Sequence, residues 1–145
     1  MTRDSYPRSP KEQLDGLCHL PRLLDKIRMR NAGQIQDYNY LTVGFDKYLL
    51  DQLSLKGEEL EKRVLQGGTD DDIVAWIHDH GKALPPEEKA KWNDMVCTGE
   101  PKNEMALQRF KALVAGIAEK RGVSVDQLPK ITKWVEAIDL DEARL

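Results

Sequence analysis

Apolar residues recur along this chain with the spacing of α-helices. The first apolar stripe consists of Leu20, Leu23, Leu24 and Ile27. The i, i+3, i+4, i+7 spacing of these positions places them on one helix face. Pro21 suits the first helical turn because its missing N–H would have no partner there, and Gly33 suits a left-handed stop. The sequence therefore predicts a helix from Pro21 to Gly33.

Later segments show the same period or carry clear start and stop signals. We expect helices at residues 45–53, 58–66, 70–80, 86–96, 104–121 and 131–138. The clearest start is Thr69, an N-cap candidate followed by three aspartates that the helix dipole favours in the first turn. Ser124 and Gln127 form a capping box around one short turn. The tryptophans of three separate stripes are predicted to be core residues: Trp76, Trp92 and Trp134.

No stretch alternates between apolar and polar residues for more than a few positions. The predicted fold class is therefore all-α, a compact bundle of about six to seven short helices with no sheet. Residues 1–13 contain Pro7 and Pro10 and are predicted to be a flexible N-terminal arm. Residues 14–145 are predicted to form a single helical domain.

Composition narrows the class of partner. Charged residues make up 32% of the chain and apolar residues 40%, which is typical of a polar globular domain. The net charge of −3 disfavours nucleic acid as a partner. The longest apolar run, residues 112–118, is far short of the roughly 20 residues that span a bilayer, and the first twelve residues lack the apolar core of a signal peptide. We expect no membrane partner, and the oligomeric state stays open.

The two cysteines, Cys18 and Cys97, lie far apart and in no metal-binding or redox spacing. A single disulfide stays open, but two reduced thiols in a cytoplasmic protein is the favoured interpretation. His78 and His80 are two positions apart on a helix and so point about 200° apart, which prevents them from sharing an ion. No glycine-rich phosphate loop is present. We therefore expect no metal and no cofactor.

The most informative segment is the first predicted helix and the residues after it. Arg22, Lys26 and Arg30 are four residues apart and share one face, where they could hold a phosphate or carboxylate. The alternative is a solvated face, or pairing with acidic residues elsewhere. Asp25 is three residues from both Arg22 and Arg28, within pairing distance on a helix surface, and could orient an arginine. The ligand-binding candidates are Arg22, Asp25, Lys26, Arg30, Tyr38 and Tyr40.

Tyr38 and Tyr40 follow this helix and either pack against it or line a pocket beside the basic residues. No combination of nucleophile, base and orienting residue is recognisable. The leading interpretation is thus a non-enzymatic binding or adaptor domain, whose partner is a protein or a small anionic ligand. The alternative is a small enzyme whose site is assembled around the following residues: Arg22, Asp25, Lys26, Tyr38 and Tyr40.

Several short motifs, taken together, carry a family resemblance. They are Leu20-Pro21-Arg22-Leu23-Leu24-Asp25-Lys26, Gly33, Tyr38-Asn39-Tyr40, Gly68-Thr69-Asp70, Trp76-Ile77, Trp92-Asn93 and the closing Ile138-Asp139-Leu140-Asp141-Glu142-Ala143-Arg144. With these motifs the chain resembles a family of small bacterial proteins known only as domain of unknown function five-zero-six-nine. The resemblance implies a small, soluble, helical bacterial protein and supplies no activity, cofactor or catalytic residue. Ala143 stands where that pattern has glycine.

Overall fold

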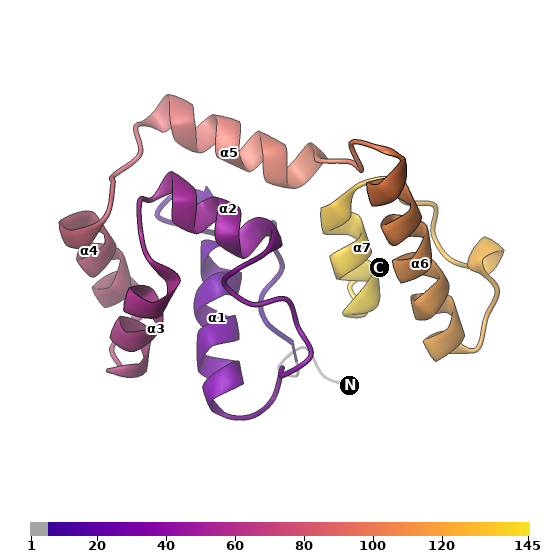
Figure 1. Ribbon diagram of the computed structural model, residues 1–145, viewed down its shortest axis with the longest axis horizontal. Coiled ribbons are helices and arrows are strands. Elements are labelled where there is room, and N and C mark those ends of the chain that lie inside the picture. The colour runs from indigo at the N-terminus through magenta and orange to yellow at the C-terminus, as the bar shows by residue number, and fades with distance from the viewer. Residues whose placement is uncertain (1–5) are drawn as a thin grey trace. The chain divides into compact units, whose positions relative to one another are not determined.

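The computed structural model describes residues 6–145, which form seven α-helices, one 3₁₀ turn and one small hairpin (Figure 1). The helices are α1 (Leu20–Asn31), α2 (Gly44–Gln52), α3 (Gly57–Leu65), α4 (Asp70–His80), α5 (Pro86–Thr98), α6 (Glu104–Arg121) and α7 (Trp134–Asp141). The 3₁₀ turn is η2 (Val125–Gln127). The predicted all-α class is confirmed.

The expectation of no sheet was wrong in one detail. Strands β1 (Gln13–Leu14) and β2 (Leu17–Cys18) pair antiparallel. The two residues between them, Asp15 and Gly16, both have positive φ angles, 54° and 73°. An Asp-Gly pair is well suited to this two-residue hairpin turn. Strands of two residues are too short for an alternating pattern to reveal them.

The chain divides into two compact units, with the boundary inside α5 between Asn93 and Asp94. Two compact units can still fold together as one domain. That residues 14–145 form a single domain therefore stays a prediction. Of the predicted arm, residues 1–5 lie outside the described residues. In the described part, Ser9 and Pro10 are buried.

In the N-terminal unit, α1 lies beside α2 and α3 and packs against α3 and β1, while α3 also packs against α4 (Figure 1). All four residues of the predicted α1 stripe are at most 1% exposed. Gly33, just after α1, has a φ of 78°, as expected for a left-handed stop. Gly81, just after α4, is required by lack of space rather than by a left-handed backbone. A Cβ there would lie 2.6 Å from the Leu53 carbonyl oxygen.

The first half of α5 is bound to the hairpin by side chains. Trp92 Nε1 donates to the Cys18 carbonyl at 2.8 Å, and Asn93 Oδ1 accepts from the Cys18 N–H at 2.8 Å. Lys89 Nζ donates to the Asp15 carbonyl at 2.7 Å. These contacts satisfy backbone groups that so short a hairpin cannot pair by itself.

In the C-terminal unit, α6 packs against α7 and η2. Its core consists of Ile117, Ala118, Leu128 and Leu140. Gly122 ends α6 with a φ of 66°, as its position predicted.

The tryptophans differ in burial. Trp92 is 4% exposed, as predicted for a core residue. Trp76 and Trp134 are only half-buried, so the prediction that they are core residues was wrong for these two. Trp76 stacks on His80 with a centroid distance of 4.5 Å, and Trp134 meets Phe110 edge-on at 5.2 Å. An amphipathic ring at the rim of a stripe can cover the core without entering it.

Candidate functional site

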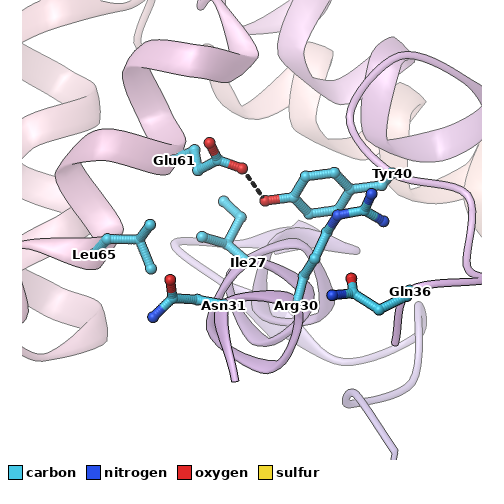
Figure 2. A pocket seen from close by; sticks show the side chains of 7 residues that line it. All are labelled: Ile27, Arg30, Asn31, Gln36, Tyr40, Glu61 and Leu65. Atoms are coloured by element: carbon cyan, nitrogen blue, oxygen red, sulfur yellow. Dashed lines mark hydrogen bonds between the residues drawn. The ribbon is translucent and has the colours of Figure 1, made fainter. Parts of the chain in front are cut away.

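A surface hollow of about 460 Å³ lies beside the C-terminal half of α1 in the N-terminal unit (Figure 2). Three segments line it: α1, α3 and the connector at residues 32–43. Its lining residues are Ile27, Arg30, Asn31, Gln36, Tyr40, Glu61 and Leu65. The hollow therefore combines one cation, one carboxylate, two amides and a phenol ring with a small apolar surface.

The helix period explains why these side chains meet. Ile27, Arg30 and Asn31 have i, i+3, i+4 spacing on α1, and Glu61 and Leu65 are four residues apart on α3. Because α1 packs against α3, these two faces are brought together. Arg30 also lies in the last turn of α1, where the helix dipole favours a positive charge.

Tyr40 joins the connector to α3. Its hydroxyl donates a short hydrogen bond to Glu61 Oε2, drawn as the dashed line in Figure 2. Burial and this carboxylate together raise the pKa of the Tyr40 phenol above its usual range. The phenol is therefore neutral at physiological pH, and its proton is directed at Glu61.

The Arg30 guanidinium lies over the Tyr40 ring, with its central carbon 4.4 Å from the ring centroid. The face of an aromatic ring attracts a cation, which favours this position of Arg30. The edges of the planar guanidinium stay available for hydrogen bonds. Among the residues that the structure describes, no carboxylate pairs with Arg30. An oxyanion in the hollow could therefore accept two parallel hydrogen bonds from Arg30.

A buried polar cluster lies behind the connector, and sequence reasoning did not find it. Asp46, on α2, has a fully buried side chain and accepts from Lys26 Nζ at 3.2 Å through each of its two oxygens. Asp46 Oδ1 also lies 2.6 Å from His19 Nε2. Asp46 Oδ2 accepts from the Leu41 N–H at 3.0 Å, and Lys26 Nζ donates to the Asn39 carbonyl at 2.9 Å.

The charges in this cluster follow from burial and pairing. Burial lowers the pKa of His19; the Asp46 carboxylate opposes this, while Lys26 and Arg22 add to it. Burial alone would raise the pKa of Asp46, but the hydrogen bond from His19 and the charge of Lys26 hold it below its usual value. The cluster therefore contains a neutral imidazole beside a Lys26–Asp46 ion pair, with the imidazole Nε2–H donating to Asp46.

The structure separates the predicted basic residues. Arg22 and Lys26 are 3% and 6% exposed, so they do not form the expected exposed surface with Arg30. The Arg22 guanidinium donates to the Arg8 carbonyl at 3.2 Å and lies 5.8 Å from the Tyr38 ring centroid. Only Arg30 and Tyr40, of the six predicted site residues, line the hollow.

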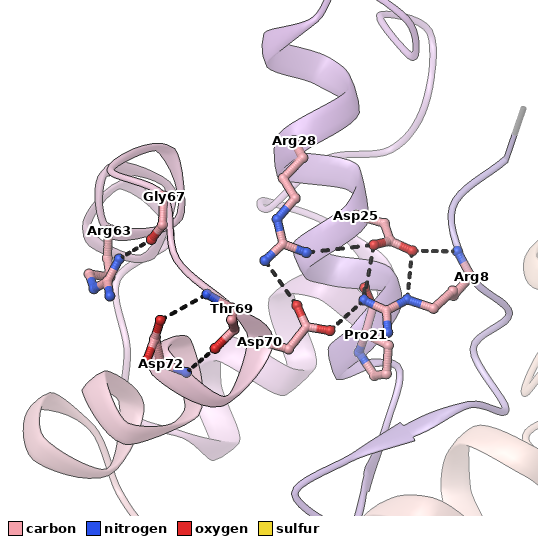
Figure 3. A network of polar contacts seen from close by, with 9 residues as sticks. All are labelled: Arg8, Pro21, Asp25, Arg28, Arg63, Gly67, Thr69, Asp70 and Asp72. Atoms are coloured by element: carbon pink, nitrogen blue, oxygen red, sulfur yellow. Dashed lines mark hydrogen bonds and ion pairs between the residues drawn. The ribbon is translucent and has the colours of Figure 1, made fainter. Parts of the chain in front are cut away.

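Asp25 belongs to a different group of residues, a surface ion network (Figure 3). Arg8 donates to Asp25 through its backbone N–H and its guanidinium at 2.9–3.0 Å, and to Asp70 at 2.9 Å. Arg28 also pairs with Asp70 at 2.9 Å, and with Asp25 at 3.8 Å. Burial would raise the pKa of Asp70, but the two arginines hold it below its usual value. The network ties the segment before β1 to α1 and α4.

The described residues contain no cluster of three or more metal-ligating side chains. Within residues 6–145, no helix combines the length and apolarity needed to cross a membrane. The hollow is the candidate site considered below, because two of the predicted site residues, Arg30 and Tyr40, line it.

A family model described as "Domain of unknown function (DUF5069)" matches residues 4–144. The chain belongs to this family. The predicted resemblance is thereby confirmed, and the match includes both compact units. A search of curated proteins gives no significant match.

Membership in the DUF5069 family assigns no chemistry, so the hollow must be interpreted from its own residues. Sequence reasoning missed three of its polar residues: Asn31, Gln36 and Glu61. Glu61 could have been suspected only with knowledge that α3 packs against α1. Asn31 and Gln36 are exposed polar residues that no sequence pattern distinguishes from ordinary surface residues.

Proposed function

We propose that the N-terminal unit is a non-enzymatic binding module that holds a small anionic ligand in the hollow. The observation that carries the proposal is the Arg30 guanidinium, stacked on Tyr40 and facing the hollow without a carboxylate partner among the described residues. Asn31 and Gln36 offer further donors and acceptors, while Ile27 and Leu65 offer apolar contact. A carboxylate or phosphate group attached to a small polar body fits this set of groups.

The lining of the hollow favours binding over covalent catalysis. Its seven residues include no serine, cysteine or histidine, and its one carboxylate accepts a hydrogen bond from the Tyr40 hydroxyl. This arrangement supports a site that holds a ligand without activating a nucleophile. The bacterial origin and the cytoplasmic setting stay predictions from the sequence.

A thermal-shift screen tests the proposal. The panel contains inorganic phosphate, small carboxylates, phosphorylated sugars and nucleotides, each at low and high salt. A ligand at about 100 times its Kd stabilises the folded protein by about 2.7 kcal/mol. We expect at least one small anion to raise the melting temperature, with an effect that decreases as salt increases.

The Arg30→Ala variant should remove this ligand-dependent shift, because the guanidinium is the cation that lines the hollow. Arg109→Ala is the matched control, since Arg109 is an exposed arginine of α6 in the other unit. A shift that persists in Arg30→Ala, or that disappears equally in Arg109→Ala, contradicts the proposal.

Glu61 provides a second test of the ligand's charge. Glu61→Gln keeps an oxygen that accepts from Tyr40 and removes a negative charge from the hollow. An anionic ligand should then bind more tightly. Weaker binding of every stabilising ligand would instead indicate that the ligand presents a cationic group to Glu61 and would contradict an anion as the ligand.

A further inference from the structure

Tyr40 lies between two residues whose backbone groups are held by buried charges. On one side, the Asn39 carbonyl accepts from Lys26 Nζ at 2.9 Å. On the other side, the Leu41 N–H donates to Asp46 Oδ2 at 3.0 Å. Lys26 and Asp46 also bind each other at 3.2 Å, so one ion pair fixes both neighbours of the tyrosine.

Residues 32–43 contain no helix or strand, and Leu41 has a φ of 58°, a left-handed conformation that is unfavourable for a leucine. Surrounding contacts must therefore hold this backbone in place. The side chains that supply these contacts are almost fully buried, with Lys26 7% and Asp46 0% exposed. Charge-assisted hydrogen bonds in such a setting are strong and directional.

We propose that Lys26 and Asp46 are positioning residues for the hollow, which fix the backbone on both sides of Tyr40 and so hold its ring beneath the Arg30 guanidinium. This inference rests on the proposed function, because it assigns the buried pair a role in the same site. Neither residue lines the hollow, so each acts through Tyr40. His19 completes the cluster, because its Nε2 lies 2.6 Å from Asp46 Oδ1 and orients that carboxylate.

The test uses a signal that needs no ligand. Because Arg30 stacks on Tyr40 at 4.4 Å, the aromatic ring current should displace the NMR signals of the Arg30 side-chain protons. Lys26→Met removes the donor to Asn39 and keeps most of the aliphatic stem. We expect the Arg30 signals in Lys26→Met to move to the positions that they have in Tyr40→Leu, which lacks the ring.

Two controls separate positioning from general loss of stability. Lys47→Met removes a lysine whose side chain pairs with Asp51 on the exposed surface of α2. Ile73→Val should destabilise the core at α4, and Ile73, which is fully buried there, is not a member of the buried cluster. Both variants should keep the wild-type Arg30 signals. Unchanged Arg30 signals in a folded Lys26→Met variant would overturn the proposal.

If Lys26→Met does not fold because Asp46 loses its partner, the double variant Lys26→Met/Asp46→Asn removes both charges and carries the same expectation. The wild-type protein supplies a further measurement. The Leu41 amide should exchange with solvent as slowly as the amides in the middle of α1, although it lies in a connector. Exchange at the rate of an open loop would overturn the proposal.

Titration with inorganic phosphate distinguishes this inference from the proposed function. If phosphate binds the wild type, its affinity should fall several-fold in Lys26→Met and stay unchanged in Lys47→Met. Displaced Arg30 signals in a protein that never binds small anions would support the positioning role and contradict the proposed function. Anion binding with wild-type Arg30 signals in Lys26→Met would support the proposed function and contradict the positioning role.

Discussion

His19 is a neutral imidazole enclosed at the start of α1. Burial lowers its pKa below the ordinary 6.5, and the nearby charges of Lys26 and Arg22 act in the same direction. The positive end of the α1 dipole also disfavours a protonated ring at this position. In the unfolded chain the imidazole takes up a proton near its ordinary pKa. The unfolded state therefore binds more protons than the folded state below about pH 6.5.

The sign of this linkage gives a pH prediction. The stability that depends on neutral His19 is fully present above about pH 6.5 and is lost as the pH falls toward the lowered pKa of the folded state. Urea denaturation at pH 7.5, 6.5 and 5.5 should show a decreasing free energy of unfolding. His19→Gln keeps a donor for Asp46 and should flatten this dependence, whereas His80→Gln, at an exposed position, should not. Equal pH dependence in wild type and His19→Gln would refute the assignment.

Ala143 has a φ of 61° just after α7, at the position where the family resemblance led us to expect glycine. A left-handed conformation costs an L-residue about 1–2 kcal/mol, and glycine gives back about 0.4–1 kcal/mol through the flexibility of the unfolded chain. Ala143→Gly should therefore leave the free energy of unfolding unchanged or raise it by up to about 1.6 kcal/mol. Ala115→Gly, at an exposed position inside α6, should lower it by about 1 kcal/mol. Similar losses in both variants, measured by urea denaturation, would contradict this interpretation.

Asp25 is one of the residues that hold the segment before β1 to the helices. Both oxygens of Asp25 accept from Arg8, and the side chain is 20% exposed. Asp25→Ala should lower the free energy of unfolding by about 1–2 kcal/mol and speed amide exchange in residues 8–12. Asp51→Ala, which breaks an exposed pair four residues apart on α2, should cost about 0.5 kcal/mol or less. If the melting temperature of Asp25→Ala equals that of the wild type, Asp25 is only a solvated charge.

Helices α1, α4 and α6 were predictable because their stripes and caps are local. Thr69 and Asp72 form a capping box at the start of α4, and α6 runs from Glu104 to Arg121 as expected. The buried charges were harder to predict. Asp46 shares a buried stripe with Leu49, Leu50 and Leu53, at i, i+3, i+4 and i+7. The available signal for the buried cluster was thus a carboxylate at an apolar stripe position. A buried carboxylate needs a cation from elsewhere in the fold as its partner.

Whether the basic residues on this face of α1 are buried depends on packing between elements. Arg22, Lys26 and Arg30 share a helix face, but that face is covered along most of its length by the segment before β1 and by the connector. Because helix periodicity does not reveal what covers a face, the sequence could not separate the two buried cations from the one at the hollow. Arg30 differs only in lying in the last turn of α1.

The molecule as a whole carries a net charge of −3, so an anionic ligand must be attracted by a local arrangement of groups rather than by the overall charge. Within the N-terminal unit, the buried Lys26–Asp46 pair is internally neutralised, and the surface arginines Arg8 and Arg28 are paired with aspartates. Arg30 faces the hollow without such a pair among the described residues. The positive charge in the lining of the hollow therefore comes from Arg30, and the Glu61 carboxylate on the same lining opposes it.

An NMR titration of the ¹⁵N-labelled protein with the anion that stabilises it most tests this arrangement directly. Saturable chemical-shift changes should centre on Arg30, Asn31, Gln36 and Tyr40, and they should be absent in Arg30→Ala. Arg109→Ala should show the wild-type pattern. Shift changes that centre outside the hollow, or that are the same in Arg30→Ala as in the wild type, would contradict the proposal that this hollow binds a small anion through Arg30.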